Sequence, residues 1–333
     1  MRLDCSAPTR IDLAGGTLDI WPLYLFHRDA QTLNAAISLR AHASIESIAG
    51  EGVQIESVDT GRRVRVKHWT ELAGTTDLPL LARILTFFEA GGLKLTTRGE
   101  SPAGAGIAGS SALNIAVCAA MARWTGRQYS AEQLLAIAMN VEAQAIDVPT
   151  GLQDYRPAYY GGVAALELGP AGAVRVPIPI DPAELERRIV LAYTGQPRQS
   201  GTNNWDIYKR HIDGDRHVFE CFERIRDTAA AMRAALIRSD WLEVGRQIEA
   251  EWEHRKQLAP GVTTPGIDAL ISSARAAGAT AAKVCGAGGG GCLFCYTDPD
   301  RTAAVGAALA AGGARLLPYR LEAEGVQFSE RVG

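Results

Sequence analysis

The stretch Pro102-Ala-Gly-Ala-Gly-Ile-Ala-Gly-Ser-Ser-Ala112 decides the fold of this chain. It joins three glycines and two serines to an apolar, helix-forming run that extends to Trp124. The first N–H groups of a helix have no partner within the helix, and its N-terminus carries about half a positive charge. A glycine loop that leads into such a terminus is a common binding site for phosphate groups. The stretch therefore predicts a nucleotide or another phosphorylated ligand.

The same stretch spells Gly-x-Gly-x-x-Gly, a pattern that also occurs in dinucleotide-binding folds. Those folds need a second strand after the helix and an acidic residue about 20 residues further on. Here Gly126 ends the helix, and Ser130-Ala-Glu-Gln133 has the pattern of a capping box that begins another helix. A Walker A loop is excluded because no Gly-Lys-Ser/Thr follows the glycines. On this motif alone, a helix start packed tightly against the rest of the protein stays an alternative.

Length and composition describe a globular protein. The chain has 333 residues, 47% of them hydrophobic and 21% charged, which is typical of a globular protein with about two domains. The net charge of −3 gives no electrostatic reason to expect nucleic acid or an anionic membrane as a partner. The longest apolar run, Ile107 to Trp124, is rich in Ala, Ser and Gly, so we expect a buried helix rather than a membrane span. Because the N-terminus lacks the apolar core of a signal peptide, we expect a cytoplasmic location.

The six cysteines give little reason to expect a metal site. Cys292 and Cys295 form a CxxC within Cys-Leu-Phe-Cys-Tyr, which has the pattern of a strand. Side chains three apart on a strand point to opposite faces, so a shared metal or a redox disulfide is not expected. We predict buried, reduced thiols instead.

The alternation of strand and helix patterns predicts an α+β fold of two domains. The proline-rich segment 177–182 marks the boundary between an N-terminal domain, residues 1–180, and a C-terminal domain, residues 181–333. Strands are expected at 5–13, 33–47, 93–97, 163–168, 174–177, 188–193, 281–285 and 292–296, with two more inside 53–68. Helices are expected at 78–88, 110–124, 131–145, 215–236, 240–257 and 267–277.

A second glycine-rich segment, Gly286-Ala-Gly-Gly-Gly-Gly291, lies between two strand-like runs. Glycine loses more conformational freedom on folding than any other residue, so five in six positions indicate a backbone that approaches something closely. A flexible hairpin tip is the alternative, but the flanking residues are apolar. We therefore favour a buried loop that closes over the first phosphate site.

Two further segments carry charged residues in suggestive places. Arg10 lies in a strand pattern that is followed by Gly15-Gly16 and Asp19, which is typical of a polar site at a strand end, although a surface salt bridge would also explain Arg10. Glu142 falls late in a predicted helix, where its charge opposes the helix dipole and a bound cation would compensate it. Asp154 follows Gly151 in a predicted loop, where catalytic acids commonly lie.

In their order along the chain, these four segments resemble the motifs of the GHMP kinase superfamily. The superfamily includes galactokinase, homoserine kinase, mevalonate kinase and phosphomevalonate kinase. The matching motifs are Pro8-Thr-Arg-Ile-Asp-Leu-Ala-Gly-Gly-Thr-Leu-Asp19, Pro102 to Ala112, and Lys283-Val-Cys-Gly-Ala-Gly-Gly-Gly-Gly-Cys292. Together they span nearly the whole chain.

Within the superfamily, the chain is similar to sugar 1-kinases of the D-glycero-D-manno-heptose 7-phosphate kinase type. The supporting segments are Leu33-Asn-Ala-Ala-Ile-Ser38, Gly151-Leu-Gln-Asp-Tyr155 and Tyr193-Thr-Gly-Gln-Pro-Arg198. Two departures stand out. Thr17-Leu18-Asp19 replaces the usual third glycine and Thr-Asp, and Gly109 stands where a serine is frequent.

The resemblance implies an N-terminal domain like ribosomal protein S5 domain 2 and a ferredoxin-like C-terminal domain. It implies ATP, with its phosphates on Gly104, Ala105, Gly106, Ile107, Ala108, Gly109, Ser110 and Ser111. It also implies a covering loop formed by Gly286, Ala287, Gly288, Gly289 and Gly290. Mg²⁺ would be held by Ser110 and Glu142 together with phosphate oxygens.

The implied reaction transfers the γ-phosphoryl group of ATP to a sugar hydroxyl, the anomeric C1 hydroxyl of a heptose or heptose phosphate. Asp154 would accept or orient the hydroxyl proton, and Arg10 would stabilise the charge of the transferring group. Substrate contacts are expected from Gly16, Thr17, Asp19 and Arg198. The alternative for Asp19 is a turn-capping role, and the alternative for Arg198 is a position on the surface. A kinase for fucose, galactose, mannose or a mevalonate-like acid is the first alternative function. A non-catalytic small-molecule-binding module is the second, although the joint presence of Arg10, Glu142 and Asp154 argues against it.

Overall fold

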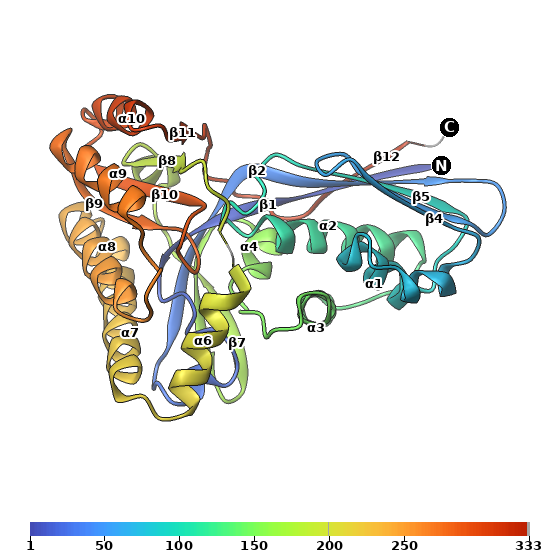
Figure 1. Ribbon diagram of the computed structural model, residues 1–333, viewed down its shortest axis with the longest axis horizontal. Helices are drawn as coiled ribbons and strands as arrows, with labels where there is room; N and C mark the ends of the chain where they lie inside the picture. The colour runs from blue at the N-terminus through green and yellow to red at the C-terminus, as the bar shows by residue number, and fades with distance from the viewer. Residues whose placement is uncertain (199, 332–333) are drawn as a thin grey trace.

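Two β-sheets, each with its own helices, organise the described part of the chain, which in this computed structural model is residues 1–198 and 200–331 (Figure 1). The larger sheet has eight strands in the order β12-β1-β2-β5-β3-β4, and β6 pairs with both β2 and β7. Its strands are β1 (Arg2–Ala14), β2 (Gln31–Ser47), β3 (Val53–Ser57), β4 (Arg62–Val66), β5 (Leu93–Gly99), β6 (Val163–Gly169), β7 (Gly172–Pro177) and β12 (Gln327–Arg331).

Helices cover one face of this sheet (Figure 1). They are α1 (Pro79–Phe88), α2 (Gly109–Trp124), α3 (Ala131–Ile146) and α4 (Tyr155–Tyr160), with short 3-10 turns η1 (Leu23–Leu25) and η2 (Trp69–Gly74) in the connections. The predicted capping box is present, because the Gln133 N–H donates to Ser130 Oγ and the Ser130 N–H donates to Gln133 Oε1. Helix α2 is buried along most of its length, as predicted for the longest apolar run.

The second sheet has four antiparallel strands in the order β11-β8-β10-β9. Its strands are β8 (Ile189–Tyr193), β9 (Ala279–Val284), β10 (Cys292–Thr297) and β11 (Arg315–Leu316). The helices of this half are α5 (Pro182–Glu186), α6 (Ser200–Ile212), α7 (Arg216–Ile237), α8 (Trp241–Lys256), α9 (Pro265–Ala276) and α10 (Thr302–Ala311). The long helices α7 and α8 pack against each other at the left of Figure 1.

The thiol prediction is confirmed on β10. Cys292 lies in the core shared with β1 and β2, whereas Cys295 faces the core formed with α9 and α10. The two side chains therefore point to opposite faces of the strand, and both are free thiols. Burial raises the pKa of each to about 12, so both stay protonated at neutral pH. None of the helices within the described ranges combines the length and apolar character needed to cross a bilayer.

The predicted strands and helices lie within a few residues of the observed ones, and the Ala-rich, helix-forming run near 303–311 lies in α10, but the sequence interpretation missed α4, α5, α6, β11 and β12. Strand β12 pairs antiparallel with β1, from Ser6 opposite Gln327 to Arg2 opposite Arg331. The division into residues 1–180 and 181–333 is therefore wrong for the last strand, which belongs to the first sheet. It covers an edge that β1 would otherwise expose. Helix α6 was missed because Ser-Gly-Thr-Asn-Asn at its start has a turn-forming composition.

Candidate active site

The loop before α2 lines a cleft of about 350 Å³. Gly104, Gly106 and Ala108 adopt positive φ angles of 67°, 77° and 62°, so the chain turns sharply before the helix begins. No side chain caps the N-terminus of α2, which leaves its first N–H groups open to an anionic ligand. The loop therefore has the geometry of a phosphate site.

Seven of the eight predicted phosphate-loop residues line this cleft, namely Gly104, Ala105, Gly106, Ala108, Gly109, Ser110 and Ser111. Ile107 is the exception. Its side chain is fully buried, and its carbonyl accepts a hydrogen bond from the Arg10 N–H at 3.0 Å. Ile107 therefore anchors the loop to β1 rather than facing a ligand.

Gly109 is explained by its neighbour Ser101. A Cβ atom at position 109 would lie 2.6 Å from Ser101 Oγ, closer than real Cβ contacts allow. The frequent serine of this motif would fit only if the Ser101 hydroxyl moved.

The second glycine-rich segment is a buried loop that packs against the phosphate loop, as predicted. The Cys292 N–H donates to the Ala105 carbonyl at 2.6 Å, and the Arg198 N–H donates to the Gly104 carbonyl at 3.1 Å. Gly291 has a φ of 78°, and a Cβ atom there would lie 2.6 Å from the Ala105 oxygen. Only glycine permits this approach of the two backbones.

The five named residues of this loop have different surroundings. Gly286 and Ala287 line a second, smaller cavity of about 30 Å³ next to the phosphate cleft. Gly288 and Gly289 pack against Val262 instead, and Gly289 donates its N–H to the Val262 carbonyl at 2.8 Å. Gly290 lies against the backbone of the Gln196–Arg198 segment.

Arg10 and Asp154 meet where the two cavities adjoin. Arg10 is 1% exposed, donates from Nε to Asp154 Oδ1 at 3.1 Å, and donates from Nη1 to the Gly106 carbonyl at 3.1 Å. The surface salt bridge that we considered for Arg10 is therefore wrong. Burial opposes its charge, but Asp154 and Asp12 outweigh burial and raise the pKa of Arg10, so the guanidinium stays ionised. The pair places a fixed cation and a carboxylate beside the phosphate loop.

Asp19 contributes a buried carboxylate to the smaller cavity. Its Oδ2 accepts from the Gln153 N–H at 2.8 Å, and its Oδ1 has no partner within the described residues. This bond joins two distant segments, so Asp19 does not merely cap its own turn. Burial and the nearby Asp154 charge raise the pKa of Asp19 to about 6. Asp19 thus offers a free acceptor to a ligand.

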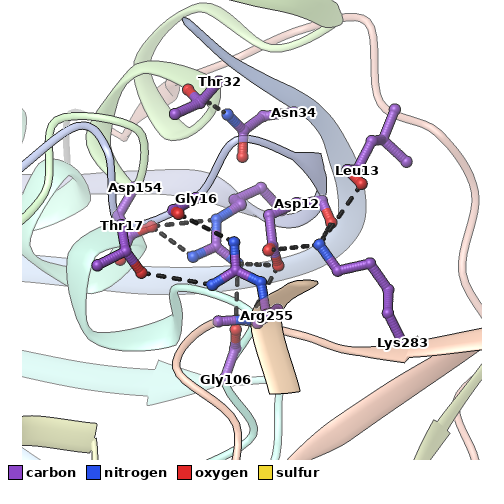
Figure 2. Close-up of polar contacts among 12 residues, drawn as sticks. Asp12, Leu13, Gly16, Thr17, Thr32, Asn34, Gly106, Asp154, Arg255 and Lys283 are labelled. Carbon is purple, nitrogen blue, oxygen red and sulfur yellow. Dashed lines mark hydrogen bonds and ion pairs between the residues drawn. The ribbon is translucent and has the colours of Figure 1, made fainter. Parts of the chain in front are cut away.

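The other predicted substrate residues also lie at or near the smaller cavity. Thr17 and Arg198 line the smaller cavity, whereas Gly16 does not. The Gly16 carbonyl accepts from Arg255 Nη2 at 2.9 Å (Figure 2). Arg198 forms no ion pair with a carboxylate in the part of the chain that the structure describes, and burial lowers its pKa. A partly buried cation of this kind suits an anionic ligand.

Ser110 and Glu142 form the one oxygen pair predicted to hold a metal. Ser110 Oγ donates to Glu142 Oε1 at 2.7 Å, and both residues line the phosphate cleft. Burial is the main cause that raises the pKa of Glu142. Across residues 1–198 and 200–331, no group of three or more His, Cys, Asp and Glu side chains could hold a metal ion. A hard cation at this pair would therefore need phosphate oxygens and water as further ligands.

A network of buried ions beneath the site escaped sequence reasoning (Figure 2). Lys283 Nζ lies 3.0 Å from Asp12 Oδ2 and 3.1 Å from Glu251 Oε2. Arg255 binds Glu251 on α8 and reaches Gly16 and Thr17. Burial alone would raise the pKa of Asp12, but Lys283 and Arg10 lower it to about 2. The i,i+4 spacing of Glu251 and Arg255 was the available signal, although it does not reveal that the pair is buried.

Comparisons with known proteins identify the family of this chain. The GHMP kinases N terminal domain matches residues 79–162, and the GHMP kinases C terminal domain matches residues 232–315. The chain belongs to the GHMP kinase superfamily and has its two-domain fold. It is a phosphotransferase with an alcohol group as acceptor.

The chain is similar to the following three proteins, among others. The D-glycero-alpha-D-manno-heptose 7-phosphate kinase of Campylobacter jejuni is 29% identical over 88% of this chain and 89% of its own length. The mevalonate kinase of Thermococcus onnurineus is 24% identical over 99% of both chains. A solved D-glycero-D-manno-heptose 1-phosphate kinase from Bacteroides thetaiotaomicron has a TM-score of 0.81, with 23% identity over 99% of this chain and 100% of that one.

Replacing Lys283 tests the buried network. We expect Lys283→Met to lower the free energy of unfolding by about 3–5 kcal/mol, because Asp12 and Glu251 lose their buried partner. Urea unfolding would measure the loss. Lys256→Met, which breaks a more exposed pair with Glu253, is the control and should cost less than about 1 kcal/mol. Equal effects of the two substitutions would contradict the role given to Lys283.

Replacing Asp19 tests its raised pKa. Since the folded protein binds the Asp19 proton more tightly than the unfolded chain, its stabilising contribution is full below about pH 4 and is lost as the pH rises through about 6. Asp19→Asn should therefore be more stable than the wild type by about 2–3 kcal/mol at pH 7.5 and similar in stability near pH 4. Urea unfolding across this pH range measures the difference in stability. A difference that does not grow with pH would contradict the raised pKa of Asp19.

Proposed function

We propose that this protein transfers the γ-phosphoryl group of ATP to a sugar, with the anomeric C1 hydroxyl of a heptose or heptose phosphate as the acceptor. One observation carries the proposal. The Arg10–Asp154 pair lies between a phosphate cleft and a small polar cavity that contains the free Oδ1 of Asp19.

The cavity chemistry favours a sugar over a carboxylic acid. A hydroxyl group can donate a hydrogen bond to Asp19 Oδ1, whereas the carboxylate of a mevalonate-like acid would be repelled by Asp19 and Asp154. The similarity to the heptose kinase of Campylobacter jejuni also supports a sugar as the acceptor. Arg198 supports a phosphorylated substrate, because its guanidinium, which forms no ion pair within the described ranges, can bind a phosphate of the sugar or of ATP.

ATP would place its phosphates on the 104–111 loop and the N-terminus of α2. The residues at the metal position fit Mg²⁺, because a buried carboxylate and a hydroxyl are the hard oxygen ligands that this ion takes. Ser110 and Glu142 would hold it, and the ion would neutralise charge on the phosphate oxygens.

Asp154 would receive the proton of the attacking hydroxyl, or orient that hydroxyl toward the phosphorus. Arg10 holds the Asp154 carboxylate in place and presents positive charge to the transferring group. Phosphoryl transfer needs little covalent chemistry from the protein, so alignment and charge neutralisation account for most of the acceleration.

A substrate panel tests the proposed reaction. We expect Mg-ATP turnover, followed as ADP release, to be stimulated by D-glycero-D-manno-heptose 7-phosphate more than by D-mannose, L-fucose, D-galactose or mevalonate. Stimulation by mevalonate alone would replace the sugar proposal with the acid kinase. No stimulation by any compound would favour a binding module.

Replacing Asp154 tests its role at the reacting atoms. Asp154→Asn should lower kcat by about 10²–10⁴, because the group that accepts or orients the proton is lost. Circular dichroism checks that the variant is folded, and Asp300→Asn, at an exposed position far along the chain, serves as the matched control. A folded Asp154→Asn enzyme that loses less than about tenfold in kcat would show that the assignment is wrong.

A further inference from the structure

We propose that Asn204 contacts both substrates, donating a hydrogen bond from Nδ2 to the transferring phosphoryl group and accepting one at Oδ1 from the sugar hydroxyl next to the reacting one. The inference rests on the proposed sugar kinase function and adds a residue that selects the acceptor. Asn204 lies in the first turns of α6 and matches none of the superfamily motifs.

The position of Asn204 is the first argument. Four residues line both the phosphate cleft and the smaller cavity, namely Gly151, Asp154, Arg198 and Asn204. The phosphoryl group must pass between these two cavities, so a residue that borders both lies beside its path.

The hydrogen-bonding capacity of these four residues is the second argument. The Asp154 carboxylate only accepts, the Arg198 guanidinium only donates, and Gly151 has no side chain. The Asn204 amide alone among the four has a donor and an acceptor on one rigid plane. It can therefore bind an anionic phosphoryl oxygen and a neutral hydroxyl at the same time.

The buried acceptor of Asn204 is the third argument. Its Oδ1 has no hydrogen-bond partner within the described residues. A buried polar atom without a partner costs free energy, and a ligand hydroxyl would remove that cost. The same cost would return whenever the acceptor sugar lacks that hydroxyl, which is how such sites reject deoxy analogues.

Helix α6 fixes the direction of this side chain. Asn204, Ile207 and His211 follow the spacing of one helix face, and Ile207 and His211 are 2% and 6% exposed. His211 Nε2 lies 2.8 Å from Nε2 of His27, in the segment that follows Asp19. Helix α6 is thus tied to the segment that carries Asp19, so Asn204 is held toward the site.

The test compares a sugar with its 2-deoxy analogue. D-mannose and 2-deoxy-D-glucose differ only in the hydroxyl next to C1, so the pair isolates the contact that we assign to Oδ1. We expect Asn204→Ala to lower kcat/KM for mannose by about 10- to 100-fold and to change kcat/KM for the deoxy sugar far less. Asn204→Asp keeps the acceptor but loses the donor and adds a negative charge, so it should raise the KM for ATP and lower kcat.

The controls separate contact from structure. Asn140→Asp, on the exposed face of α3, is the matched control and should leave all constants within about twofold of the wild type. Should Asn204→Ala not fold, Asn204→Ser gives the same comparison. Equal losses on both sugars, or no loss on either, would overturn the inference. A wild-type enzyme that phosphorylates no sugar would instead overturn the proposed function.

Discussion

The buried ion pair between Asp12 on β1 and Lys283 on β9 is the interaction on which the site depends. It joins the two sheets just before the loop at 286–291 begins. The same carboxylate accepts the Gly286 N–H at 2.9 Å and lies 3.5 Å from Arg10 Nη1. One side chain therefore sets the position of the covering loop and of the cation that holds Asp154. Charges buried this deeply are stable only when all their partners are in place, which makes the arrangement rigid.

This rigidity suits phosphoryl transfer, in which a protein acts mainly by alignment and by stabilising charge. Arg10 cannot move away from Asp154 without leaving the Gly106 carbonyl that it also binds. Arg255 similarly holds the carbonyl of Gly16 and the hydroxyl of Thr17, close to Asp19. A few buried charges thereby help to hold together the phosphate loop, the loop at 286–291 and the smaller cavity.

The sequence predicted most of this arrangement because its strongest signals are local. Glycine spacing, a capping box and strand alternation report backbone geometry within a few residues, and they identified the loops at 104–111 and 286–291 correctly. The resemblance to the superfamily motifs then implied that Arg10 and Asp154 act at one site. What was missed depends on distant partners. In the sequence, Lys283 is an ordinary lysine in a strand, and its role becomes visible only when its side chain is seen to reach Asp12 on β1. Strand β12 likewise becomes evident only when its pairing with the edge of β1 is seen. Asn204 lies in a turn-like segment whose helix is stabilised by packing against its surroundings.

The most direct measurement of the central claim is a ³¹P NMR spectrum of the wild-type protein incubated with Mg-ATP and D-glycero-D-manno-heptose 7-phosphate. We expect the ATP resonances to decline while a new phosphomonoester resonance appears, split by coupling to the anomeric proton of the sugar. A spectrum that shows only ADP and inorganic phosphate, or a new phosphoester on another carbon, would contradict transfer to the C1 hydroxyl.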